Sequence, residues 1–66
     1  MELDQYLNHA FLAGQPSIQV VHGKGTGTLR RVVQEQLTNH PLVKSFRPAE
    51  LEEGGGGVTI IELVER

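Results

Sequence analysis

One segment near the middle of the chain gathers residue types that bind anions and exchange protons. It reads His22-Gly23-Lys24-Gly25-Thr26-Gly27-Thr28-Leu29-Arg30-Arg31 and lies between an apolar run and an amphipathic one. This order is typical of a strand, a glycine-rich turn and a helix. Backbone N–H groups in such a turn can converge on an anion, and the lysine beside them adds a full positive charge. We therefore interpret the segment as a phosphate-sized anion site.

Two familiar phosphate-binding motifs do not fit this segment. A P-loop requires four residues between its first glycine and a Gly-Lys-Ser/Thr triplet, and Gly23 and Lys24 do not have that spacing. The dinucleotide fingerprint requires a third glycine three residues after the second, where this chain has Arg30. The site must therefore belong to another class.

Two arginines fall in the first turn of the expected helix. Cations at that position oppose the positive end of the helix dipole, at a cost of roughly 0.3–1 kcal/mol each. A bound anion would turn both side chains into ligands, whereas the alternative is that both extend into water, where the cost is small. We favour the anion site and predict that its ligands are Gly23, Lys24, Gly25, Thr26, Gly27, Thr28, Arg30 and Arg31.

His22 stands at the end of the expected strand, next to the proposed site. Histidine exchanges a proton near neutral pH, so it could act as general base or acid in phosphodiester cleavage. The alternative is a polar residue that merely ends a strand. We give His9 and His40 no chemical role.

No metal site is predicted from the sequence. The spacing of the three histidines matches no zinc pattern, and the acidic cluster Glu50, Glu52 and Glu53 lies in a glycine-rich loop that is poorly suited to holding a cation. We predict no cofactor, and only a divalent ion such as Mg²⁺ is left open.

Composition places the chain among small soluble domains. Its 66 residues contain no cysteine, so no disulfide or thiolate metal site can stabilise it. No apolar stretch approaches the roughly 20 residues that span a bilayer, and the start carries Glu2 and Asp4 instead of a basic segment. We therefore expect a cytoplasmic protein without a membrane partner.

Charge is distributed unevenly along the chain. The formal net charge is −2, which by itself argues against a general nucleic-acid binder. No acidic residue lies between Gln5 and Gln34, however, and Lys24, Arg30 and Arg31 all fall in that stretch. Positive potential is therefore expected around the glycine turn despite the acidic total.

Hydrophobic periodicity predicts helices over residues 2–13 and 28–40 and strands over 17–22, 42–47 and 58–64. Leu29, Val32, Val33, Gln36 and Leu37 should form the inner stripe of the second helix. The predicted core consists of Leu7, Phe11, Ile18, Val20, Val33, Leu37, Val43, Ile60 and Leu63. The stretch from Pro48 to Gly57 should be a mobile connection, because its four consecutive glycines lose much conformational freedom on ordering.

This order of elements predicts an α+β fold. Two helices should pack on one face of a small mixed β-sheet as a two-layer sandwich. The first two strands should be parallel, because the connection between them contains a helix, and the last strand can then return antiparallel.

The motifs taken together resemble the Smr, or small MutS-related, domain, in particular the version at the C-terminus of bacterial MutS paralogues that act outside mismatch repair. The resemblance covers nearly the whole chain. It rests on motifs that occur together and in order: His-Gly-Lys-Gly-Thr-Gly at 22–27, Leu29-Arg30, His40-Pro41, Ser45-Phe46-Arg47 and Gly57-Val58-Thr59.

The resemblance implies two helices over a four-stranded mixed sheet, with the last strand antiparallel between its neighbours. It implies nicking endonuclease activity on DNA or RNA, binding of branched DNA as in recombination, and, for some relatives, action on collided ribosomes in ribosome quality control. His22 and Lys24 would be the catalytic residues. The family also has an N-terminal Leu-Asp-Leu-Arg/His-Gly strand, which residues 1–66 lack, so we expect an Smr domain truncated to three strands with an open edge.

These expectations lead to one primary hypothesis and two alternatives. The primary hypothesis is a nucleic-acid-binding hydrolase module of a larger MutS-like protein, weakly active or inactive alone. The first alternative is a module that binds DNA or rRNA, or docks on the ribosome, without chemistry. The second is a structural tail that associates through its exposed sheet edge.

Overall fold

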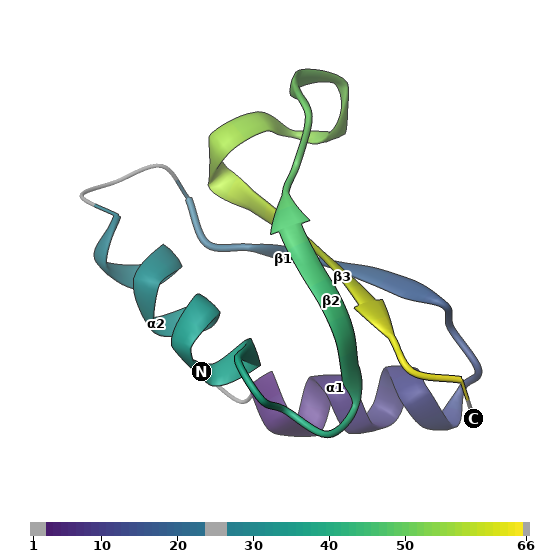
Figure 1. The fold of residues 1–66 in the computed structure, drawn as a ribbon. Helices are drawn as coiled ribbons and strands as arrows, with labels where there is room; N and C mark the ends of the chain where they lie inside the picture. The colour runs from purple at the N-terminus through teal and green to yellow at the C-terminus, as the bar shows by residue number, and fades with distance from the viewer. Residues whose placement is uncertain (1–2, 24–26, 66) are drawn as a thin grey trace.

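A computed structural model describes residues 3–23 and 27–65, which form two helices and three strands (Figure 1). In chain order the elements are α1 (Leu3–Leu12), β1 (Ser17–Val21), α2 (Thr28–Leu37), β2 (Val43–Pro48) and β3 (Val58–Leu63). Every expected helix and strand is therefore confirmed. The second helix is shorter than the predicted 28–40. Thr38 is extended and Asn39 has a left-handed φ of 65°, so the helix ends at Leu37.

The strands form one sheet in the order β1-β3-β2. β3 pairs antiparallel with both neighbours, opposing Ile18 with Ile61 on one side and Phe46 with Ile61 on the other. β1 and β2 consequently run in the same direction without touching. Both hydrogen-bonded pairs are antiparallel, whereas the sequence predicted a mixed sheet.

The core lies between one face of this sheet and the two helices. A single cluster joins residues of α1, α2, β1 and β3: Leu3, Leu7, Ala10, Ile18, Val20, Val33, Leu37, Ile61 and Leu63. Of the predicted core, Phe11 and Val43 are only half-buried, and Ile60 is buried on the opposite face of the sheet from Ile61. The two-layer α+β sandwich is confirmed.

The inner stripe of α2 is narrower than predicted. Val33 and Leu37 are buried, but Leu29, Val32 and Gln36 are exposed. Leu29 shares the stripe of Val33 and Leu37, yet it lies one turn closer to the helix start, where it lines a surface hollow instead of the sheet. Val32 and Gln36 lie at the edge of the stripe, because each precedes a buried position by one residue, about 100° around the helix.

The glycine-rich connection between β2 and β3 has a defined structure where the sequence predicted a mobile one. It forms two 3₁₀ turns, Leu51–Glu53 and Gly55–Gly57, beyond the end of the strands (Figure 1). Arg47 donates two hydrogen bonds to the Glu53 carboxylate, with N···O distances of 2.9 and 3.1 Å. Gly54 has a φ of 122°, and a Cβ there would come within 2.8 Å of Val58 Cγ2. The glycine is thus required by close packing.

Within the described residues, no helix is long and apolar enough to cross a membrane.

Candidate functional site

A hollow of about 320 Å³ lies where β1 ends and α2 begins. Its walls come from His22, from the two ends of the glycine turn (residues 23–27) and from the first two turns of α2. They are His22, Gly23, Gly27, Thr28, Leu29, Arg30 and Val32. Five of the residues predicted to form the site therefore meet in one place: His22, Gly23, Gly27, Thr28 and Arg30. Lys24, Gly25 and Thr26 lie outside the described residues.

The two described glycines of the turn are required by backbone conformation. Gly23 has a φ of 79° and Gly27 a φ of 86°, and a Cβ added at either would meet no atom within 4 Å. An L-residue would fit in space but would be strained in this left-handed region. Gly27 is also the N-cap of α2, and as a glycine it has no side chain that could cap that helix. The start of α2 lines the hollow, and the positive end of the helix dipole at that place favours an anion.

One carbonyl of the second 3₁₀ turn, directly before β3, fixes the backbone where the glycine turn begins. Gly57 O accepts hydrogen bonds from both His22 N, at 2.9 Å, and Gly23 N, at 3.0 Å. The glycine-rich connection that we expected to be a plain linker thus holds the strand end that carries His22. Sequence reasoning missed Gly57, because nothing local in a run of four glycines indicates which carbonyl faces another strand.

The His22 side chain is buried, with 7% of its surface exposed. Its Nε2 atom lies 2.8 Å from Thr59 Oγ1, and its Nδ1 atom lies 3.1 Å from Gly23 O. Both ring nitrogens therefore have partners within the protein. Sequence reasoning also missed Thr59, although a threonine amid the apolar residues of the last strand was an available signal.

Neighbouring arginines have different surroundings. Arg30 lines the hollow, whereas the Arg31 guanidinium makes an exposed ion pair with Glu35, with an N···O distance of 3.2 Å. Arg31 is one turn from Glu35, the i,i+4 spacing that brings opposite charges together on a helix. Arg31 therefore already has an acidic partner on its own helix, whereas Arg30 is part of the wall of the hollow.

Among the described residues, no group of three or more His, Asp or Glu side chains is gathered as a metal site. In the acidic cluster, Glu53 is already occupied by Arg47 and by the backbone N–H of Glu50. These two partners lower the pKa of the Glu53 carboxyl from 4.5 to about 2. His40 is likewise structural: Nδ1 accepts from Leu42 N, so Nε2 donates to Asp4, at 2.7 Å.

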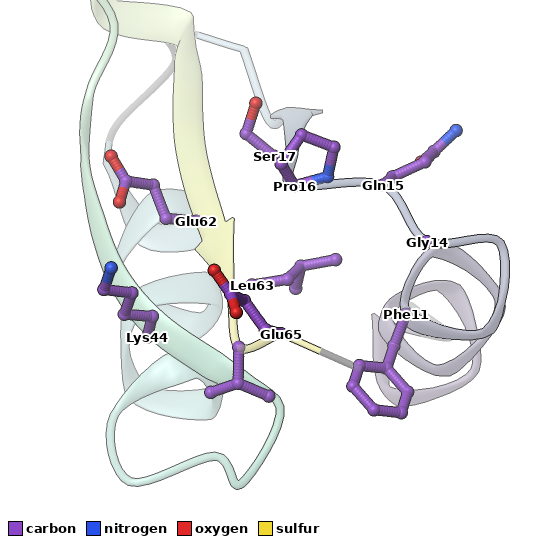
Figure 2. Close-up of a pocket in the computed structure, with 10 residues that line it drawn as sticks. Phe11, Gly14, Gln15, Pro16, Ser17, Lys44, Glu62, Leu63 and Glu65 are labelled. Carbon is purple, nitrogen blue, oxygen red and sulfur yellow. The ribbon is translucent and has the colours of Figure 1, made fainter.

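A second hollow, of about 380 Å³, lies at the opposite end of the sheet, beside the start of β1 and the end of β3 (Figure 2). Phe11 of α1 stands on one side, and Lys44 and Glu62 stand on the other (Figure 2). It is the larger of the two, but Glu62 and Glu65 place two carboxylates against the single Lys44 amine. This charge balance repels phosphate, so the hollow near His22 is the better candidate for an anion.

The family model described as "Smr domain" matches residues 1–64. The chain is 56% identical over 61 residues to "Endonuclease MutS2" of Bacillus velezensis, and 52% identical over 63 residues to the protein of that name from a Geobacillus strain. These matches cover 92% and 96% of this chain but only 8% of each relative.

Two solved structures share the fold. The Smr domain of Thermus thermophilus MutS2 superposes with a TM-score of 0.91 at 43% identity, over 96% of this chain and 79% of that one. YdaL, a stand-alone small MutS-related protein from Escherichia coli, superposes with a TM-score of 0.88 at 23% identity, over 96% of this chain and 53% of that one. The chain therefore belongs to the Smr domain family.

Proposed function

We propose that this domain binds a backbone phosphate of DNA or RNA in the hollow between His22 and Arg30, as the nucleic-acid-binding module of a MutS2-like endonuclease. The observation that carries this proposal is one hollow lined by the start of α2, by two glycines with left-handed backbone and by Arg30. The similarity to proteins named endonuclease supports nucleic acid as the source of the phosphate.

Phosphate contacts of this kind are independent of base sequence. Backbone N–H groups and one guanidinium would fix the position of the strand, and Lys24 would add a second cation at the turn. Affinity would come largely from the release of counterions, so binding should weaken steeply as salt is added. Of the described residues around the hollow, Leu29 and Val32 are apolar and offer no hydrogen bond to a base edge.

Cleavage would use His22 for proton transfer and Lys24 to stabilise charge on the phosphate. Gly23 O can only accept, so Nδ1 of His22 carries the hydrogen, and Nε2 is the nitrogen with a lone pair when the ring is neutral. In the structure that lone pair faces the Thr59 hydroxyl. Proton transfer to or from a substrate therefore requires the ring to exchange this partner.

A binding module without chemistry is the second candidate. The observation that favours it is the same engagement of both His22 nitrogens inside the protein, with 7% of the residue exposed. In that role the domain would hold DNA, rRNA or a ribosome for another part of a longer protein.

A nicking assay separates the two candidates. The chain would replace the native Smr domain of the Bacillus velezensis relative, and supercoiled plasmid would be incubated with the unchanged chimera and with its His22→Ala and Arg30→Ala variants. We expect His22→Ala to lower the nicking rate by about 10²–10⁴-fold with little loss of binding, the range that positioned proton transfer contributes. Arg30→Ala should weaken both.

The control is His9→Ala, which removes an exposed histidine on α1 and should leave nicking unchanged. Nicking that survives His22→Ala while binding still depends on Arg30 would support the binding module and reject the catalytic role of His22. Binding that is indifferent to Arg30→Ala would reject the phosphate site itself.

A further inference from the structure

A hydroxyl is buried in the most apolar strand of the molecule. Thr59 is 1% exposed, and its neighbours in β3 are Val58 and Ile60. It opposes Val20 of β1, so its side chain faces the core. A buried hydroxyl without a partner is costly, and the partner here is His22 Nε2, 2.8 Å away.

The two partners of His22 determine which ring nitrogen carries hydrogen. A carbonyl oxygen has no hydrogen to donate, so the contact between Gly23 O and Nδ1 requires a hydrogen on Nδ1. In the neutral ring Nε2 is then an acceptor, and the Thr59 hydroxyl is the donor that satisfies it. Gly57 O accepts hydrogen bonds from the backbone N–H groups of both His22 and Gly23. These two bonds hold Gly23 O at its place beside His22 Nδ1.

We propose that Thr59 is a positioning residue for His22: its hydroxyl holds the ring in place and, with Gly23 O, fixes the neutral tautomer that carries hydrogen on Nδ1. This leaves Nε2 as the nitrogen with a lone pair, held by the Thr59 hydroxyl until the ring exchanges that partner for a substrate. The consequence for catalysis rests on the proposed function, whereas the tautomer itself is a property of the folded chain.

Thr59 does not act as a nucleophile. A hydroxyl within hydrogen-bond distance of a histidine whose other nitrogen is oriented by an acceptor has the layout of an activated nucleophile. With 1% exposure, however, the Thr59 hydroxyl cannot meet a phosphodiester. Its influence must pass through the ring of His22.

The tautomer can be measured by NMR on the ¹⁵N-labelled chain, from the chemical shifts of the two ring nitrogens of His22 at a pH where the ring is neutral. The wild-type ring should show one protonated nitrogen, Nδ1, and one unprotonated nitrogen, Nε2. A wild-type ring with hydrogen mainly on Nε2, or divided equally between the two, overturns the proposal whatever any variant does.

Two substitutions then isolate the hydroxyl. Thr59→Val keeps the branched shape but removes the donor, and Thr59→Ser keeps the donor but removes a methyl group. We expect Thr59→Val to reduce the Nδ1-protonated population and Thr59→Ser to restore it, in samples whose backbone amide spectra show the native fold. Should Thr59→Val leave the ring shifts unchanged, or should a folded Thr59→Ser behave like valine, the proposal is wrong. If the valine variant fails to fold, the ring shifts of the wild type and of the serine variant still test the proposed role of Thr59.

Nicking by the chimera supplies the second arm. Thr59→Val should lower the rate constant at saturating plasmid by about tenfold without weakening binding, the lower end of the loss known for residues that orient metal-ligating histidines. Thr59→Ser should restore most of the rate. If His22→Ala has no effect on nicking, the catalytic part of the proposed function fails, and the ring shifts still test the role of Thr59 independently.

Discussion

The two adjacent arginines show how strongly one position along a helix changes what a charge can do. Both lie in the first turn of α2, where the helix dipole disfavours cations. Arg30 lines the hollow, where a bound phosphate would compensate its charge. Arg31 is compensated by Glu35 on the next turn. From the sequence both were equivalent, because the direction of each side chain depends on how α2 is rotated against the sheet.

This difference leads to a prediction at the residue scale. Arg30→Gln should weaken binding of a single-stranded oligonucleotide and lower the slope of log K against log salt by about 0.7, the value for one phosphate contact on a single strand. Arg31→Gln should change the slope much less, since Glu35 already neutralises this charge. Fluorescence anisotropy titrations between low and physiological salt measure both. Equal losses of slope in the two variants would show that the pairing with Glu35 does not matter.

At the scale of elements, the connection between β2 and β3 departs most from what its composition suggests. Four glycines and three glutamates indicate a mobile and repulsive loop. The Arg47 side chain counters this by donating two hydrogen bonds to the Glu53 carboxylate, and Gly54 allows close packing on Val58. The result is a defined turn whose last carbonyl, Gly57 O, holds the glycine turn of the candidate site.

The pKa of Glu53 gives this connection a testable pH dependence. Hydrogen bonds from Arg47 and from the Glu50 backbone lower that pKa to about 2 in the folded chain, against 4.5 without these partners. A lowered pKa means that the ionised carboxylate stabilises the fold. The stabilisation is complete above about pH 4.5 and is lost as the pH falls from there toward 2.

Glu53→Gln should therefore reduce the free energy of unfolding at pH 7, and the difference from wild type should shrink between pH 4.5 and pH 2. Urea titrations across this range measure it. Glu52→Gln is the matched control, because Glu52 lies on the same turn but forms no ion pair with any described residue. A constant difference between Glu53→Gln and wild type at all pH values would contradict the ion-pair explanation.

The sequence predicted the elements well and their long-range contacts poorly, for a physical reason. Helix and strand positions follow from local apolar spacing and could be predicted, except for the end of α2, which lies at Leu37 instead of residue 40. The pairing of His22 with Thr59 and the contacts made by Gly57 O join residues far apart in the chain, and no local pattern encodes them. The exposure of Leu29 was missed for a related reason: periodicity shows which side of a helix is apolar, but not how far the sheet extends beneath it.

At the scale of the whole molecule, the two ends of the sheet differ in charge and in backbone geometry. The end that contains the glycine turn has Arg30 and a helix start with a glycine N-cap, and the Glu53 carboxylate at this end is paired with Arg47. The far end has a larger hollow with two carboxylates and one amine. The net charge of the whole chain, −2, therefore does not describe the local charge at either end of the sheet. An anion should bind at the end with the glycine turn in preference to the far end.

NMR titration of the ¹⁵N-labelled chain would locate binding across all described residues at once. Inorganic phosphate and a short single-stranded oligonucleotide should both shift the amide signals of Gly23 and of Gly27 to Arg31. Signals of Gln15, Glu62 and Glu65, around the far hollow, should move little, because its two carboxylates repel the ligand.

The acidic turn at Glu50–Glu53 provides a stricter comparison, since it lies at the same end of the sheet but on the other side of β3. Its signals should also move less than those of the glycine turn. Larger shifts at Glu50–Glu53 than at Gly27–Arg31 would place the anion elsewhere, and shifts with the oligonucleotide alone would mean that the hollow recognises more of a nucleotide than its phosphate.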